Sequence, residues 1–106
     1  VKYNYIFALL NLDRLDEAFV IIKQIKRVST IHIAYSKSGE GLKWAKSIKN
    51  DTKYLEGVYY LKKGLLAKAQ KCFTLHLRNR RRGIYSDFTK RQVMKKINEC
   101  LHHPKP

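Results

Sequence analysis

The chain of 106 residues contains few acidic residues, few residues that interrupt helices and no long apolar segment. Its eight Asp and Glu oppose 23 Lys and Arg, which leaves a formal net charge of +15. Two prolines and five glycines leave room for long regular elements. The longest apolar run, Tyr5 to Leu10, is far shorter than the roughly 20 residues that cross a bilayer. We therefore expect a protein without a membrane span and with a strongly basic surface.

Cysteine is scarce as well, since the chain contains only Cys72 and Cys100. Both fall on apolar faces of separate expected helices, so we expect two reduced, buried thiols in a cytoplasmic protein, although a disulfide stays possible. Neither cysteine has a second one at metal-site spacing, and the sequence predicts no metal and no cofactor. No secretory signal segment is recognisable. The start at Val1 leaves open that the chain is part of a longer protein.

Apolar residues recur at helical spacing along most of the chain, which predicts one all-α domain over residues 1–101. The β-branched segment 28–33 could form a strand, but nothing nearby would pair with it, so a helix is expected. The expected elements are three helical hairpins at about 2–28, 30–49 and 53–80, a terminal helix at 87–101 and a tail at 102–106. Residues expected to face the core in the first and last helices are Tyr5, Ile6, Leu9, Leu10, Val93, Met94, Ile97, Cys100 and Leu101.

Polar residues and glycines mark the expected helix ends. Asp13 is placed to cap the second helix of the first hairpin. The segment Asn50-Asp51-Thr52 is typical of a turn with an N-cap, and Gly64 is expected to end the helix that follows it. Ser86 or Asp87 would cap the terminal helix.

One segment, residues 57–73, combines a glycine, an aromatic pair, a second glycine at a turn, then alanine and an aromatic residue. These are Gly57, Tyr59-Tyr60, Gly64, Ala69 and Phe73. Their order resembles a tetratricopeptide repeat, and residues 10–18 are similar to the turn and second helix of another copy. The resemblance implies hairpins stacked into a short right-handed superhelix with a concave face that binds peptides. Residues that would lie on this peptide groove are Asn4, Phe7, Tyr35, Tyr54 and Lys62.

No motif in the sequence predicts catalysis. The acidic pair Asp16–Glu17 fits the start of a helix, where the macrodipole favours negative charge. The glycines lack the spacing of a phosphate-binding loop. No serine or cysteine has a base at a typical local spacing, although residues distant in sequence could still meet. We therefore expect a protein that is not an enzyme.

The excess of positive charge indicates an acidic partner. The leading expectation is a protein-interaction scaffold with a basic surface, part of a larger protein or assembly. The alternative is an RNA-binding or other nucleic-acid-binding module, because a basic patch binds phosphates and the neighbouring Tyr85 and Phe88 could stack on bases. The residues expected in that patch are Arg78, Arg80, Arg81, Arg82, Lys90, Arg91, Lys95 and Lys96.

Overall fold

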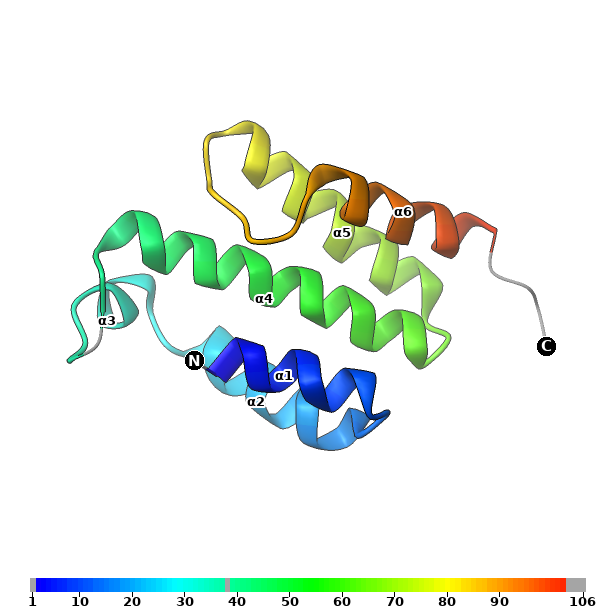
Figure 1. Cartoon of the computed structure of the whole chain (residues 1–106), viewed down its shortest axis with the longest axis horizontal. Coiled ribbons are helices and arrows are strands. Elements are labelled where there is room, and N and C mark those ends of the chain that lie inside the picture. The colour runs from blue at the N-terminus through cyan, green and yellow to red at the C-terminus, as the bar shows by residue number, and fades with distance from the viewer. Residues whose placement is uncertain (1, 38, 103–106) are drawn as a thin grey trace.

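The computed structural model describes residues 2–37 and 39–102, and its regular elements in this part of the chain are all helices. The longest of them, α4 (Leu42–Lys62), lies in the middle of the molecule. Figure 1 shows α1 and α2 on one side of α4 and α5 and α6 on the other. The fold class predicted from the sequence, all-α, is confirmed.

The first hairpin joins α1 (Lys2–Asn11) to α2 (Leu15–Arg27). The predicted core positions Ile6, Leu9 and Leu10 are buried, whereas Tyr5 is 54% exposed and was wrongly placed in the core. The expected cap at Asp13 is also wrong. Asp13 lies in the turn with a φ of 57°, and α2 starts after Arg14 without a side-chain cap.

A short helix, α3 (Thr30–Ala34), packs on α4 and confirms the choice of helix over strand for most of the β-branched segment. Its N-cap is Ser29, whose hydroxyl accepts a hydrogen bond from the backbone N–H of His32 at 3.1 Å. Such a bond satisfies one of the amide groups that the first turn of a helix leaves without a partner.

The turn expected at Asn50-Asp51-Thr52 is wrong, because α4 continues through these residues without a break. All three are buried, and their polar side chains have partners inside the protein. The Thr52 hydroxyl donates to the carbonyl of Ile48 one turn earlier, while Asn50 and Asp51 bond to α5 and to the segment after it. The second half of the predicted middle hairpin and the start of the third are therefore one helix.

A tight turn connects α4 to α5 (Leu66–Arg81). Gly64 adopts a φ of 79°, a conformation that glycine reaches without steric cost, and it follows the end of α4 as predicted. Ala69 and Phe73 are completely buried. A Cβ at Gly57 would come within 2.6 Å of the Phe73 ring, so the glycine allows the two helices to approach closely.

The last helix, α6 (Lys90–Leu101), starts with a capping box formed by Thr89 and Gln92. The predicted caps Ser86 and Asp87 are therefore wrong. Of the apolar residues expected to face the core, Val93 and Cys100 are buried and Ile97 packs against the core, but Met94 and Leu101 are exposed. The predicted tail begins at His102, which caps α6, and its remaining residues lie outside the described part of the chain.

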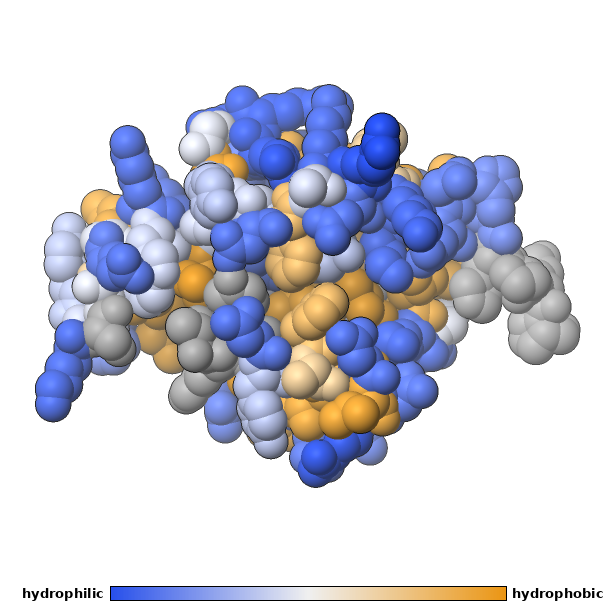
Figure 2. Space-filling view, viewed as in Figure 1, coloured by the Kyte–Doolittle hydropathy of each residue, from blue (hydrophilic) through white to orange (hydrophobic). Residues whose placement is uncertain are grey.

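None of the helices in the described residues combines the length and the apolar character needed to cross a membrane. Figure 2 shows hydrophobic surface in the centre of one face, over α1 and α4, between hydrophilic margins. Exposed apolar side chains of α1 include Tyr5 and Phe7. The molecule measures 46 × 30 × 18 Å along its principal axes.

Candidate functional site: a basic cleft

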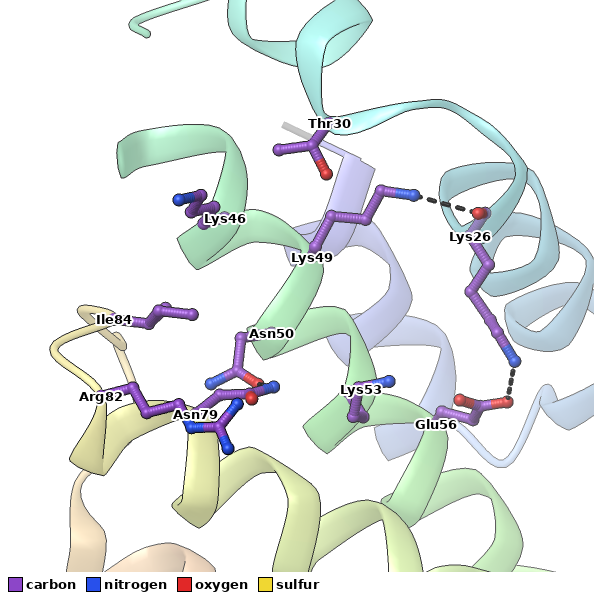
Figure 3. A pocket seen from close by; sticks show the side chains of 10 residues that line it. All are labelled: Lys26, Thr30, Lys46, Lys49, Asn50, Lys53, Glu56, Asn79, Arg82 and Ile84. Carbon is purple, nitrogen blue, oxygen red and sulfur yellow. Dashed lines mark hydrogen bonds and ion pairs between the residues drawn. The ribbon is translucent and has the colours of Figure 1, made fainter. Parts of the chain in front are cut away.

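A cleft with a volume of about 530 Å³ opens between the end of α2, the start of α3, one face of α4 and the C-terminal end of α5. Five cationic side chains and a single carboxylate line it. We call it the basic cleft, and its lining residues are Lys26, Thr30, Lys46, Lys49, Asn50, Lys53, Glu56, Asn79, Arg82 and Ile84. Figure 3 shows these side chains from close by.

The unbroken helix α4 places three lysines along the cleft. Lys46, Lys49 and Lys53 follow one another at spacings of three and four residues, which puts them on one face of a helix. Sequence reasoning missed these three residues because the turn expected at 50–52 would have separated Lys53 from the others. A continuous helix across this segment is the signal that would have revealed them.

Two of the cations are held by protein groups. Lys26 Nζ lies 2.8 Å from Glu56 Oε2, and the Glu56 side chain is almost fully buried. Lys49 Nζ donates to the carbonyl oxygens of Ile25 at 2.9 Å and Lys26 at 3.0 Å. These carbonyls belong to the last turn of α2, where the macrodipole favours a positive charge. Both lysines therefore fix the end of α2 against α4.

The remaining cations of the cleft are unneutralised. In the described part of the chain, no ion pair or side-chain hydrogen bond engages Lys46, Lys53 or Arg82. Burial, followed by the positive charges of Lys53 and Lys26, lowers the pKa of Lys49 below its ordinary value. The cleft is consequently a region of uncompensated positive charge, and an anion placed in it would stabilise the charged form of Lys49.

Two amides that line the cleft connect α4 and α5. Asn79 Nδ2 donates to Asn50 Oδ1 at 3.0 Å, and Asn50 Nδ2 donates to the carbonyl of His76 at 3.2 Å. This chain of bonds fixes the α5 side of the cleft relative to the lysines on α4. Figure 3 shows Arg82 and the lysines of α4 approaching the cleft from different elements.

The predicted patch of eight basic residues does not gather in one pocket. Only Arg82 lines the basic cleft, whereas Arg78 lines a separate hollow on α5 together with Lys71. Arg80 donates to the carbonyl of Phe88, and Lys96 Nζ lies 3.3 Å from Glu99 Oε2. The other members are exposed side chains at the end of α5 and on α6, namely Arg81, Lys90, Arg91 and Lys95.

The predicted peptide groove does not form from its five residues. Tyr54 is 4% exposed, because its ring packs against Phe73, His76 and Phe88, so its assignment to a groove is corrected. The others are exposed but dispersed. Asn4 and Phe7 lie on α1, Tyr35 follows α3, and Lys62 ends α4 with its Nζ 3.2 Å from Asp13 Oδ1.

A serine, a histidine and an aspartate do meet in the core, although no local motif predicted it. His76 Nε2 lies 2.9 Å from Asp51 Oδ1 and 3.1 Å from Ser86 Oγ. The Ser86 hydroxyl itself donates to Asp51 Oδ1, and the backbone N–H of Asp87 donates to Asp51 Oδ2 at 2.9 Å. The Asp51 carboxylate thus accepts hydrogen bonds from three donors. We call this group of His76, Asp51 and Ser86 the buried polar cluster.

The geometry of the buried polar cluster differs from that of a catalytic triad. In a triad, one ring nitrogen of histidine faces the serine and the other faces the carboxylate. Here Nε2 faces both, and Nδ1 is the one buried side-chain nitrogen or oxygen in the described residues that lacks a partner. His76 is completely buried, which keeps substrates away from it. The cluster therefore acts as a structural lock between α4, α5 and the segment before α6.

No known protein family, curated protein or solved structure matches this chain.

Both cysteines of the chain are unpaired, with Cys72 half-buried and Cys100 buried. Burial, and then the charge of Glu56, raises the pKa of the Cys72 thiol to about 11. Cys72 therefore stays protonated at neutral pH and is a poor nucleophile. Within the described residues, no group of three or more His, Cys, Asp and Glu side chains is placed to hold a metal ion.

Proposed function

We propose that this chain is a non-enzymatic protein-interaction module that binds an acidic segment of a partner protein in the basic cleft. The observation that carries the proposal is the lining of the cleft, where five cationic side chains face one carboxylate. Like charges gathered in one cleft repel one another and disfavour the folded state, and such a cost is commonly found at binding sites. Three unneutralised cations in one cleft are therefore best explained by an anionic ligand.

The size of the cleft supports a short segment of polypeptide as the ligand. A volume of about 530 Å³ is in the range of pockets that bind small molecules or a few side chains. The net charge of +15 would steer an acidic partner toward the protein and accelerate association at low ionic strength. The hydrogen bond from Lys49 to the carbonyl of Ile25 and the bond between the amides of Asn79 and Asn50 would keep the cleft preorganised before binding.

Nucleic acid is less well supported. Proteins that bind single strands combine basic grooves with aromatic side chains on which bases stack, and no aromatic residue lines the basic cleft. The exposed Tyr85 lines a different pocket, next to Trp44. The arginines expected to bind RNA do not share one site. Arg82 lines the basic cleft, Arg78 lines the hollow near Lys71, and the Arg80 guanidinium bonds to the backbone carbonyl of Phe88.

We further propose that the two hairpins α1–α2 and α4–α5 are tetratricopeptide-like repeats of a short right-handed superhelix within a larger protein or assembly. The close approach of Gly57 to Phe73 and the glycine turn at Gly64 support this. In such arrays each repeat packs only on its neighbours, so apolar surface on a terminal helix is covered by the next repeat. The cytoplasmic location expected from the two unpaired cysteines remains part of the proposal.

The test compares two variants that remove equal charge. The cleft variant carries Lys46→Gln, Lys53→Gln and Arg82→Gln, and the control variant carries Lys71→Gln, Lys90→Gln and Lys95→Gln at exposed positions outside the cleft. Binding of labelled acidic peptides is followed by fluorescence anisotropy over a series of salt concentrations.

We expect the cleft variant to bind the acidic peptide at least about tenfold more weakly, a change of about 1.4 kcal/mol, and the control variant to bind within about threefold of the wild type. Equal loss in both variants would show that the charge acts nonspecifically and would reject the cleft. RNA of matched charge is the comparison ligand. Tighter binding of RNA, weakened by Arg78→Gln with Arg81→Gln, would favour the nucleic-acid function instead.

A further inference from the structure

We propose that the part of the basic cleft lined by Lys53 and Arg82 is a subsite for a phosphate monoester, carried on a side chain of the acidic segment. This proposal rests on the proposed function, in which the cleft binds an acidic segment of a partner protein. Lys53 comes from the face of α4 and Arg82 from the residue that caps α5. Both line the cleft, and neither side chain makes an ion pair or a hydrogen bond within the described residues.

The pattern of neutralisation within the cleft locates this subsite. Lys26 is neutralised by Glu56, which follows Lys53 by one helical turn on α4, and two of the N–H groups of Lys49 are occupied by the carbonyls of α2. Lys53 lies one helical turn beyond Lys49 and close enough to lower its pKa. Because Lys26 occupies Glu56, no ion pair engages Lys53 on α4 or Arg82 at the end of α5 within the described residues.

A phosphate monoester matches this charge better than a carboxylate does. It carries close to two negative charges at pH 7 and three acceptor oxygens in one compact group. An acidic peptide supplies one charge per carboxylate. In an extended segment, alternate side chains point to opposite faces, so two carboxylates on the same face are separated by two residues of chain. Arginine can bond phosphate oxygens in a bidentate manner, and lysine acts on phosphate as a point charge. One group could thus neutralise charges that arrive from both α4 and the end of α5.

The same reasoning favours a phosphorylated side chain over a nucleic-acid backbone. A phosphodiester carries a single charge, and successive phosphates are spread along the strand. The basic cleft instead places its unpaired cations around one open hollow, with the amides of Asn50 and Asn79 bonded to each other at its side. The volume of the cleft exceeds that of one phosphate and leaves room for neighbouring residues of the same segment.

The test uses three labelled peptides that differ at one central position of an acidic sequence: phosphoserine, glutamate or serine. They are titrated against the whole chain and against Lys53→Gln, Arg82→Gln and the control Lys71→Gln, which removes the same charge from the separate hollow on α5. Inorganic phosphate and a short RNA serve as competitors. Circular dichroism verifies that the variants, which alter side chains without structural partners in the described chain, remain folded.

We expect the phosphoserine peptide to bind about tenfold more tightly than the glutamate peptide, a gain typical of one added charge-assisted contact. Lys53→Gln and Arg82→Gln should abolish this preference, and Lys71→Gln should preserve it. Competition by inorganic phosphate is expected to be stronger against the phosphoserine peptide than against the glutamate peptide.

Equal binding of the phosphoserine and glutamate peptides would overturn the phosphate subsite and leave the binding of acidic segments intact. Failure of all three peptides to bind would overturn both proposals. A short RNA that displaces the phosphoserine peptide at lower concentrations than unlabelled phosphopeptide does would assign the cleft to phosphodiesters and overturn the subsite for a modified side chain.

Discussion

At the scale of single residues, Asp51 has the most demanding role in the fold. Its carboxylate is buried and accepts hydrogen bonds from His76, from Ser86 and from the backbone N–H of Asp87. A buried carboxylate is tolerated only when its oxygens are well bonded. The three donors come from α5 and from the segment before α6, so one side chain of α4 fixes the position of both.

We predict that Asp51→Ala lowers the free energy of unfolding by about 3–5 kcal/mol, because it leaves buried donors without an acceptor. Ser86→Ala removes one donor and should cost about 1–2 kcal/mol. Urea unfolding followed by circular dichroism measures both. The control is Asp16→Asn, at an almost fully exposed carboxylate, for which we expect a change within about 0.5 kcal/mol. A cost for Asp51→Ala no larger than that of the control would show that the buried polar cluster contributes nothing to stability.

Tyr54 makes stability depend on pH in the alkaline range. Burial, and secondarily the charge of Glu99, raises the pKa of Tyr54 to about 12 from 10.0. Between these two values Tyr54 binds more protons in the folded protein than in the unfolded chain, so its contribution to stability is complete below pH 10 and falls as the pH rises toward 12. The raised pKa of Cys72 acts in the same sense and the lowered pKa of Lys49 in the opposite sense. A comparison with Tyr54→Phe cancels both contributions, because both proteins contain these residues.

We therefore predict that the wild type loses about 2 kcal/mol of stability relative to Tyr54→Phe across this range. The phenylalanine ring preserves the stacking with Phe88, whose centroid lies 4.2 Å from that of Tyr54. The measurement is the difference in urea midpoint between the two proteins from pH 9 to pH 11.5. A constant difference would contradict the raised pKa of Tyr54.

At the scale of elements, α4 shows which features of the fold could be predicted from the sequence and which could not. The apolar spacing correctly predicts an all-helical chain, because Ile6, Leu9, Ala69 and Phe73 follow helical periodicity. The segment Asn50-Asp51-Thr52 suggests a turn, since such residues favour caps and turns when their side chains have no distant partners. Here tertiary bonds to α5 and Ser86 satisfy them inside a helix. Those partners lie 25 or more residues away, so local reasoning cannot find them or the lysine face that depends on them.

The packing of α4 on α5 depends on the absence of a side chain at Gly57. We predict that Gly57→Ala lowers the free energy of unfolding by about 1–3 kcal/mol, since its Cβ would lie 2.6 Å from the buried Phe73 ring. Phe73→Ala should cost about 3–5 kcal/mol on its own. The double variant should be less destabilised than the sum of the two, because the new methyl group would occupy space vacated by the ring. Additive costs in a double-mutant cycle would contradict the close contact.

At the scale of the whole molecule, the net charge of +15 works against the folded state. Repulsion among like charges increases when the chain becomes compact, and it weakens when salt shortens the Debye length to about 8 Å or less. The basic cleft concentrates this repulsion, because Lys49 lies near both Lys26 and Lys53. If the cleft is a binding site, some stability is lost there in order to hold an unoccupied anion site open.

This cost can be measured without any ligand. We predict that the cleft variant with Lys46→Gln, Lys53→Gln and Arg82→Gln melts about 4–8 °C above the wild type at low salt, as expected for roughly 1 kcal/mol in a domain of this size. High salt should reduce the difference, because screening relieves the wild type more than the variant. The control variant with Lys71→Gln, Lys90→Gln and Lys95→Gln should gain less, since its lysines lie outside the cleft at exposed positions.

An equal gain in both variants would mean that the repulsion is spread over the whole surface, and a lower melting temperature for the cleft variant would mean that these cations stabilise the fold. Only a gain confined to the cleft fits a site whose charge is balanced by a partner.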